Sequence, residues 1–234
     1  MAYQNGPKIV PNGLVFCLDA GNSKSYPGSG TTWTNLVRSG VDGTLTNGPT
    51  FNSGDGGSIV FDGIDDFVDF SQYNFGNEIT ISCFFRPSLI ANIETFFANA
   101  GAGLTPPGFK FYFNSYYNNT RAIYIEVGNN ISGAVPVNTA NSVVVYDVWQ
   151  HAACTLSKTT GIGKIYYNGN LAASNALGIT NYDTNKTFRI GRFPSGNELF
   201  PLNGRISHYC IYNRALSDAE ILQNYNAIKG RHKL

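Results

Sequence analysis

The chain has 234 residues, a length that suits one all-β sandwich better than two domains. Its net charge is +1 and only 13% of its residues are charged, so it lacks the basic patch with which proteins bind nucleic acid. No apolar run is long enough for membrane insertion, and the first residues lack the apolar stretch of a secretory signal. We therefore expect a protein made in a reducing cytoplasm.

Residues 1–12 are polar and show no periodicity, which predicts an N-terminal arm. Residues 13–234 are predicted to form a single jelly-roll domain. Alternating apolar residues between turns rich in Gly and Asn favour two antiparallel sheets packed face to face. The strands are expected at residues 13–20, 49–52, 58–61, 67–70, 78–87, 93–100, 109–114, 122–127, 143–146, 149–156, 163–167, 171–174, 186–192 and 203–212.

The last predicted strand leads into a short C-terminal helix. Its alternation places one set of side chains on a single face of the sheet, namely Ile206, His208, Cys210 and Tyr212. Ser217 and Glu220 have the spacing of a capping box, which predicts that a helix begins there. Gly230 is expected to end the helix. We expect His151 and His208 to be core or edge residues and His232 to lie in the tail.

The four cysteines, Cys17, Cys83, Cys154 and Cys210, all fall within predicted strands, and none belongs to a CxxC motif. The main interpretation is four buried free thiols, which behave as small apolar residues. A Cys17–Cys210 disulfide is the alternative, and it requires the first and last strands to pair.

Seven phrases, in order along nearly the whole chain, resemble the laminin-G-like jelly roll of the concanavalin A-like lectin and glucanase superfamily. They are GLVFCLDAGN at 13–22, GGSIVFDGIDDFVDF at 56–70, EITISCFFRP at 78–87, WQHAACTL at 149–156, GKIYYNGNLAAS at 163–174, TFRIGR at 187–192 and LNGRISHYCIYNRALSDAEI at 202–221. The resemblance implies an all-β, two-sheet antiparallel sandwich.

The opening GLVFCLDAGNSKSYPGSGTTW and the closing IYNRALSDAEILQNYNAIKGR also resemble domains in virion proteins of tailed bacteriophages. This resemblance implies a non-enzymatic structural protein on the virion. It would be a capsid decoration (cement) protein or a tail-associated domain that binds other virion proteins. Fold-level analogy adds a homo-oligomer. The alternative is a lectin-like adhesin that binds host-surface carbohydrate.

Hydrolysis is not expected. Glucanases of this superfamily carry their acid and nucleophile as Glu-x-Asp-x-Glu on one strand, where alternate residues share a face. No predicted strand of this chain contains that motif.

An acidic turn is the candidate metal site. Asp62, Asp65 and Asp66 are close together in sequence, with Asp69 nearby, and calcium prefers several oxygen ligands. The competing interpretation is turn chemistry, in which these carboxylates cap backbone amides.

Loop aromatics beside amides are the candidate glycan-binding residues, because lectins stack sugars on rings and bind hydroxyls with polar groups. The candidates are Tyr116, Tyr117, Asn118 and Asn119, then Tyr182 and Asp183 beside Asn181, and Phe193 and Phe200 around Asn197. Tyr-rich loops also form protein interfaces, so protein contact is the alternative.

Overall fold

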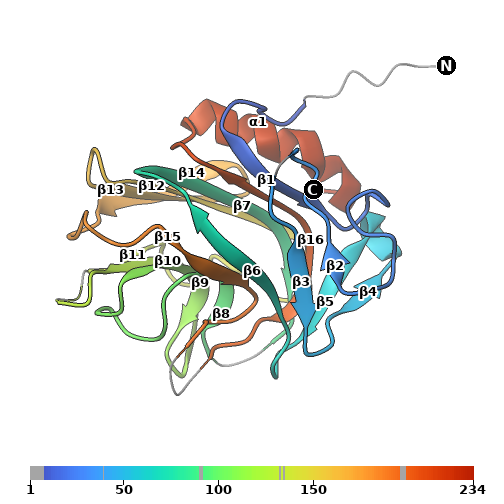
Figure 1. Cartoon of the computed structure of the whole chain (residues 1–234), viewed down its shortest axis with the longest axis horizontal. Helices are drawn as coiled ribbons and strands as arrows, with labels where there is room; N and C mark the ends of the chain where they lie inside the picture. The colour runs from blue at the N-terminus through green and yellow to red at the C-terminus, as the bar shows by residue number, and fades with distance from the viewer. Residues whose placement is uncertain (1–7, 39, 90–91, 132, 134, 196–198) are drawn as a thin grey trace.

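The structure, a computed structural model, describes residues 8–38, 40–89, 92–131, 133, 135–195 and 199–234. In this part of the chain two eight-stranded sheets pack face to face, and a C-terminal helix covers the outer side of one of them (Figure 1). The predicted antiparallel sandwich with a short C-terminal helix is therefore confirmed.

The first sheet has the strand order β14-β13-β12-β7-β16-β5-β4, and β1 pairs with the second half of β16. Neighbouring strands are antiparallel throughout. The bounds are β14 (Asn170–Ala176), β13 (Ile162–Tyr167), β12 (Gln150–Ser157), β7 (Glu78–Pro87), β16 (Asn203–Tyr212), β5 (Ser58–Asp62), β4 (Thr50–Asn52) and β1 (Leu14–Asp19).

The second sheet has the order β11-β10-β9-β8-β15-β6-β3-β2, again with antiparallel pairs. The bounds are β11 (Val137–Asn138), β10 (Asn118–Gly128), β9 (Gly108–Ser115), β8 (Glu94–Ala98), β15 (Asn185–Ile190), β6 (Phe67–Asn74), β3 (Gly43–Thr46) and β2 (Thr32–Trp33).

Aromatic rings from both sheets fill the core between them. Phe16 of the first sheet packs edge-on against Phe70 and Phe188 of the second, which stack with centroids 4.4 Å apart. The prediction that alternate residues of β7 share one face is confirmed, since all four lie in this core: Ile79, Ile81, Cys83 and Phe85.

A β-bulge in β16 changes which side chains face inward. The register of β16 against β7 shifts between Ile206 and His208. As a result Ile206 packs in the core together with Tyr209 and Ile211, whereas Cys210 packs on the outer side. The predicted single face for Ile206, His208 and Cys210 is therefore wrong, because the extra residue of a bulge reverses the alternation.

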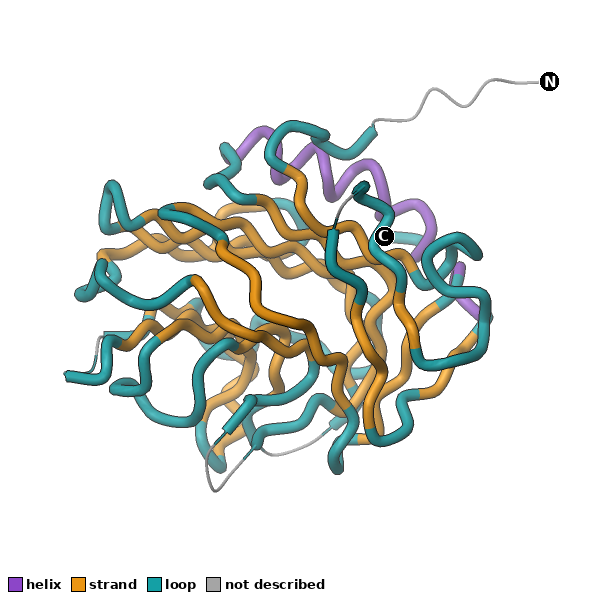
Figure 2. The backbone as a smooth tube through the Cα atoms, in the orientation of Figure 1, coloured by secondary structure: helices purple, strands orange, loops and turns teal. Residues whose placement is uncertain are grey.

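The C-terminal helix begins as the sequence predicts. In α1 (Asp218–Ile228) the Ser217 side chain accepts from the backbone of Glu220, and the Glu220 carboxylate accepts from the backbone of Ser217. Figure 2 shows the helix lying across the outer side of the first sheet. Ile221 is buried there, and the side-chain amide of Asn224 donates to the Tyr212 hydroxyl at 3.0 Å.

Beyond Ile228 the chain differs from the prediction. It continues as a 3₁₀ turn, η2 (Lys229–His232), and the left-handed residue that follows is Lys233 rather than Gly230. His232 lies in the C-terminal tail, as predicted, and the structure adds that it is buried, with its Nε2 2.8 Å from Ser207 Oγ. Neither α1 nor the 3₁₀ segments η1 (Gly54–Gly56) and η2 of the described chain has the length and apolarity of a membrane span.

The predicted N-terminal arm lies partly outside the described residues, which begin at Lys8. The remainder of the arm packs against α1. The backbone N–H of Val10 donates to Asn224 Oδ1 at 2.8 Å, and the Gln223 amide donates to the Lys8 carbonyl at 2.7 Å.

The expected strand at residues 143–146 is absent from the structure. Val144 is the only fully buried residue of this run, and the flanking residues Ser142 and Asp147 have left-handed backbone angles that interrupt an extended chain. Conversely, the short strands β2, β3 and β11 escaped prediction because two to four residues carry too little alternation.

Candidate functional site

Tyr116 and Tyr117 lie in the turn between β9 and β10, at one end of the second sheet. They are 56% and 65% exposed, and their rings meet edge to face with centroids 4.4 Å apart. Asn118 and Asn119 follow at the start of β10 and are also exposed. Asn119 Oδ1 accepts from the Tyr146 hydroxyl at 2.6 Å, which fixes this amide beside the turn.

A pocket of about 290 Å³ opens beside this turn on the outer face of the second sheet. Its floor and walls come from segments far apart in sequence. The lining residues are Ile93, Ala102, Gly103, Tyr116, Glu126, Phe193 and Phe200. We call this feature the aromatic pocket.

The aromatic walls of the pocket hold one another in place. Phe193 and Phe200 pack edge to face with centroids 5.1 Å apart, and Tyr116 meets Phe200 at 5.8 Å. The two phenylalanines are buried whereas the tyrosine is exposed. An apolar ligand face would therefore pack on the exposed ring of Tyr116, which the buried phenylalanines support from behind.

The carboxylate of Glu126 is the charged group of the pocket. It lies 2.9 Å from the buried ammonium of Lys110, its cross-strand partner, and it also accepts from the Tyr112 hydroxyl. Lys110 also donates to the Gly103 carbonyl. A carboxylate has about four acceptor sites, so Glu126 retains capacity to accept from a ligand hydroxyl.

Tyr182 and Asp183 are placed elsewhere. The ring of Tyr182 packs near Phe109 at the start of β9, whereas Tyr116 follows the end of that strand. Tyr182 is only 1% exposed and belongs to the core, so it is not a loop aromatic open to a sugar. Asp183 accepts from the Asn185 N–H at 2.8 Å, as a turn-capping carboxylate does. Asn197 lies outside the described residues.

The acidic turn brings its three carboxylates together. One ligand atom from each of Asp62, Asp65 and Asp66 lies within 4.8 Å of the others. Two of these carboxylates already accept backbone bonds within the turn, from Ile64 N–H to Asp62 at 2.8 Å and from Asp62 N–H to Asp66 at 3.0 Å. Burial, with the neighbouring carboxylates, raises the pKa of Asp66. These contacts favour turn chemistry, and calcium binding stays a prediction.

Glu94, on the same sheet as Glu126, faces the opposite way. Its cross-strand partner Phe113 belongs to the inner core, and Glu94 itself is buried. Burial raises the pKa of Glu94 to about 9, although one oxygen accepts from the Asn203 N–H at 3.0 Å. A retaining glycosidase needs two carboxyl groups about 5 Å apart on one side of a sugar, and Glu94 and Glu126 do not provide that arrangement.

The four cysteines are buried and free, as the main interpretation predicted. β1 and β16 do pair, and Cys17 lies directly opposite Cys210. His151 is a core histidine, as predicted, and its Nε2 lies 2.9 Å from Ser82 Oγ.

Sequence reasoning missed Glu126 and Ile93 as pocket residues. Glu126 sits in an ordinary strand pattern, and Ile93 precedes another strand. No sequence pattern marks Glu126 or Ile93 directly. Three of their neighbours in the pocket, Phe193, Phe200 and Tyr116, were candidates, and the structure brings these three together.

Solved structures with the same fold share little sequence with this chain. A mutant of Trypanosoma rangeli sialidase that displays trans-sialidase activity has a TM-score of 0.66 and 17% identity over 94% of this chain and 33% of the sialidase. Botulinum neurotoxin type C, which interacts with two ganglioside molecules, has a TM-score of 0.67 and 15% identity over 92% of this chain and 51% of the toxin chain. The binding domain of Paraclostridial Mosquitocidal Protein 1 has a TM-score of 0.67 and 15% identity over 92% and 52%.

This chain thus spans between a third and about half of those solved chains, and the likeness establishes the fold alone. No curated protein matches the sequence. The family model described as the concanavalin A-like lectin/glucanases superfamily matches residues 62–222, from the acidic turn to the second turn of α1. The sandwich and this match agree, and the chain belongs to the laminin-G-like group of the concanavalin A-like lectin/glucanases superfamily.

Proposed function

We propose that this domain binds carbohydrate in the aromatic pocket and does not hydrolyse it. The observation that carries the proposal is the pocket itself, in which exposed Tyr116 faces buried Phe200 beside the carboxylate of Glu126. Rings provide flat apolar surfaces for the C–H face of a sugar, and a few polar groups fix orientation.

The lining favours a neutral or amine-bearing sugar over an acidic one. Among the described residues that line the pocket, Glu126 is the only charged group, and the nearby Lys110 is buried against it. An ionised carboxylate only accepts hydrogen bonds, so Glu126 can bind a ligand hydroxyl or ammonium but offers nothing to a ligand carboxylate. The domain would in this respect differ from solved relatives in complex with sialylated ligands.

The similarities support the class of ligand. The superfamily is one of lectins and glucanases, and a botulinum neurotoxin binding domain of the same fold has been solved in complex with SialylT. Binding without turnover is supported by the opposite orientation of Glu94 and Glu126.

A glycan array probed with the full chain would test the proposal, followed by isothermal titration with the best ligand. Tyr116→Ala should weaken binding by tenfold or more, at a cost of roughly 1–3 kcal/mol for a lost stacking ring. Leu171→Ala is the matched control, because Leu171 is a comparably exposed apolar residue on β14 of the other sheet. Equal binding by Tyr116→Ala and wild type, or a uniform preference for sialylated glycans, would contradict the proposal.

Repeating the titration with calcium and with a chelator tests the acidic turn separately. If Asp62, Asp65 and Asp66 only build the turn, affinity should be the same in both buffers, and thermal stability should not change. A calcium-dependent rise in melting temperature that Asp65→Asn removes would instead establish a calcium site.

We further propose that the domain acts on the virion of a tailed bacteriophage, as a capsid decoration or tail-associated protein. The sequence segments at both ends of the chain that resemble domains of phage virion proteins support this role. It is compatible with glycan binding, because one face can dock while another binds sugar. Removing residues 1–7 leaves the contacts of Lys8 and Val10 with α1 intact, so this truncation tests a docking arm without disturbing the helix.

Incorporation into particles lacking the endogenous copy is the measurement. Full-length chain should co-sediment with particles, and the truncated chain should lose most of that association. Failure of the full-length chain to associate with capsids or tails would contradict the virion role. Light scattering of the purified chain would test the expected homo-oligomer.

A further inference from the structure

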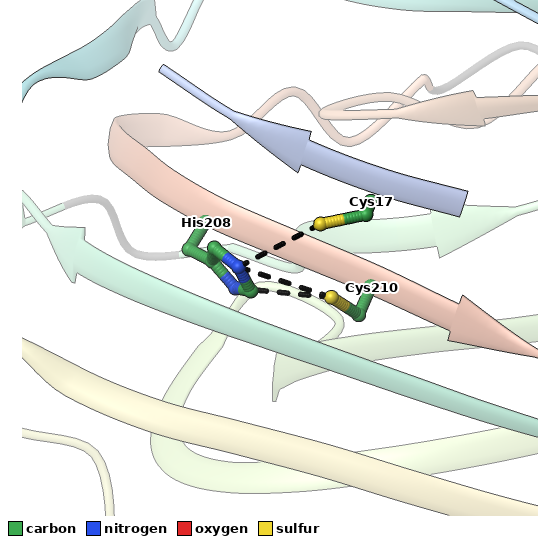
Figure 3. Close-up of side chains that lie close together, drawn as sticks. All are labelled: Cys17, His208 and Cys210. Carbon is green, nitrogen blue, oxygen red and sulfur yellow. Dashed lines mark hydrogen bonds between the residues drawn. The ribbon is translucent and has the colours of Figure 1, made fainter. Parts of the chain in front are cut away.

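Two cysteines and a histidine meet on the outer face of the first sheet. Figure 3 shows Cys17 on β1 and His208 and Cys210 on β16, with their side chains converging across the strand pair. All three are buried, and Cys17 and Cys210 belong to the apolar cluster beneath α1. Nothing in the carbohydrate-binding proposal uses them.

The strand register produces this convergence. Cys17 lies opposite Cys210, but its backbone N–H donates to Asn35 Oδ1 at 2.9 Å and its carbonyl accepts from the Leu36 N–H at 2.9 Å. Both of its polar backbone groups therefore point away from β16. Such non-hydrogen-bonded pairs bring side chains closest together in an antiparallel sheet. His208, two residues before Cys210, projects from the same side of its strand.

The distances fit a metal ion with sulfur and nitrogen ligands. Cys17 Sγ lies 4.0 Å and Cys210 Sγ lies 3.9 Å from His208 Nε2, and one ligand atom from each residue lies within 4.8 Å of the others. A tetrahedral ion with Zn–S bonds of about 2.3 Å and Zn–N bonds of about 2.0 Å holds such atoms about 3.5–3.8 Å apart. Contraction by a few tenths of an ångström would bring both sulfur–nitrogen separations to these values, and the two sulfurs, which lie within 4.8 Å of each other, would approach by up to about 1 Å.

A carboxylate borders the cluster but is already engaged. Asp19, which lies opposite His208 in the pairing of β1 with β16, is held by Arg231 through contacts of 2.6 and 2.9 Å. The two sulfurs and the imidazole are therefore the groups of this cluster that a metal ion would bind.

We propose that Cys17, His208 and Cys210 bind one thiophilic metal ion, either Zn²⁺ or Cu⁺. Both ions accept thiolate and imidazole ligands, and three protein ligands leave one position of Zn²⁺ for water. The ion would join the first and last strands of the sandwich. Its ligands Cys17 and His208 are 191 residues apart in sequence. A disulfide between the same sulfurs would require an oxidant and would give His208 no part.

The test uses the full chain, kept reduced with a phosphine and freed of metal by a chelator. Equilibrium dialysis against Zn²⁺, with elemental analysis, should give one ion per chain. Co²⁺ should produce thiolate-to-cobalt charge-transfer absorption, and competition with a Cu⁺ chelator distinguishes the two ions. Cys17→Ala, Cys210→Ala and His208→Gln should each bind metal roughly tenfold or more weakly.

Two variants serve as matched controls. Cys154→Ala removes a buried cysteine on the inner side of the same sheet, and His151→Gln removes a buried histidine outside the cluster, so both should bind metal like wild type. Wild-type chain that binds neither Zn²⁺ nor Cu⁺ and shows no cobalt charge transfer would overturn the proposal, whether or not the variants fold. A Cys17–Cys210 disulfide in protein isolated without oxidant would also overturn it.

Discussion

The outer faces of the two sheets are both covered, but in different ways. A regular helix closes the first face and leaves a layer of buried histidine and cysteine side chains. Irregular segments at residues 99–107, 191–195 and 199–202 border the second face and leave the aromatic pocket open. A helix seals a sheet continuously because its apolar stripe is straight, whereas loops leave gaps. The first face is therefore suited to stability and the second to recognition.

The two faces also differ in how they hold charge, and breaking an ion pair on each measures that difference. Replacing the buried Lys110 with Met leaves the partly buried Glu126 carboxylate without its cation, and we expect a loss of about 3 kcal/mol in unfolding free energy, the lower end for a buried pair. Lys164→Met is the control, because its pair with Asp218 at 3.0 Å is exposed and should contribute less than about 1 kcal/mol. Urea denaturation measures both. Equal losses of unfolding free energy in the two variants would show that the two faces do not differ in how they hold charge.

The attachment of α1 to the first sheet should depend mainly on one buried apolar side chain of the helix, Ile221. Ile221→Ala empties a buried site beneath α1, and we expect a loss of about 2–5 kcal/mol. The adjacent Leu222 is largely exposed, so Leu222→Ala should change the unfolding free energy by less than about 0.5 kcal/mol. Urea midpoints of the two variants provide the comparison, and similar midpoints would show that the helix is only loosely attached.

Acid should weaken the first face. Burial, with the nearby His208, lowers the pKa of His151 to about 3, so the folded chain keeps this ring neutral. The contribution of the neutral His151 ring to the unfolding free energy is fully present above the unfolded pKa of about 6.5 and is lost as the pH falls toward 3. At pH 4 the loss is roughly 3 kcal/mol. His232, with a pKa of about 4, acts in the same direction. Urea midpoints measured from pH 7 to 4 should fall steeply for wild type and less steeply for His151→Gln. Parallel curves would contradict this assignment.

The second sheet should show the opposite dependence on pH. Glu94 has a pKa of about 9 and is protonated in the folded chain. Its contribution to the unfolding free energy is therefore fully present below the unfolded pKa of about 4.3 and is lost as the pH rises toward 9. Glu94→Gln keeps a neutral side chain of the same shape. We expect it to raise the unfolding free energy by about 1–3 kcal/mol at pH 8 and to have little effect at pH 4. A variant that is less stable than wild type at pH 8 would show that the carboxylate is needed in its charged form.

The elements that the sequence predicted best are those with strong local signals. The strand Glu78–Pro87 has the predicted bounds, and the capping box of Ser217 and Glu220 is present. The strands expected at 163–167 and 171–174 are joined by a turn at Asn168 and Gly169, whose positive φ angles of 47° and 79° suit the Gly- and Asn-rich turns that the sequence predicted.

The remainder depends on contacts that a linear pattern does not contain. The bulge at Ser207 reversed the faces of β16, which no local residue preference announces. The aromatic pocket collects residues from five separate segments between Ile93 and Phe200, so it becomes visible only once the sheet is formed. Tyr182 failed as a candidate for the same reason, since a loop aromatic in the sequence proved to be a core residue in space.

The pairing of β1 with β16 has a consequence for synthesis. Within the described residues β16 is the only strand that pairs with β1, so this edge of LVFCLD must wait for residues 208–212, although Asn35 and Leu36 already bond to Cys17. Cys17 and His208 are 191 residues apart, so a long stretch of chain is synthesised while one edge of β1 lacks its strand. Chains that terminate before residue 208 would keep that edge unpaired, and such edges recruit one another into aggregates.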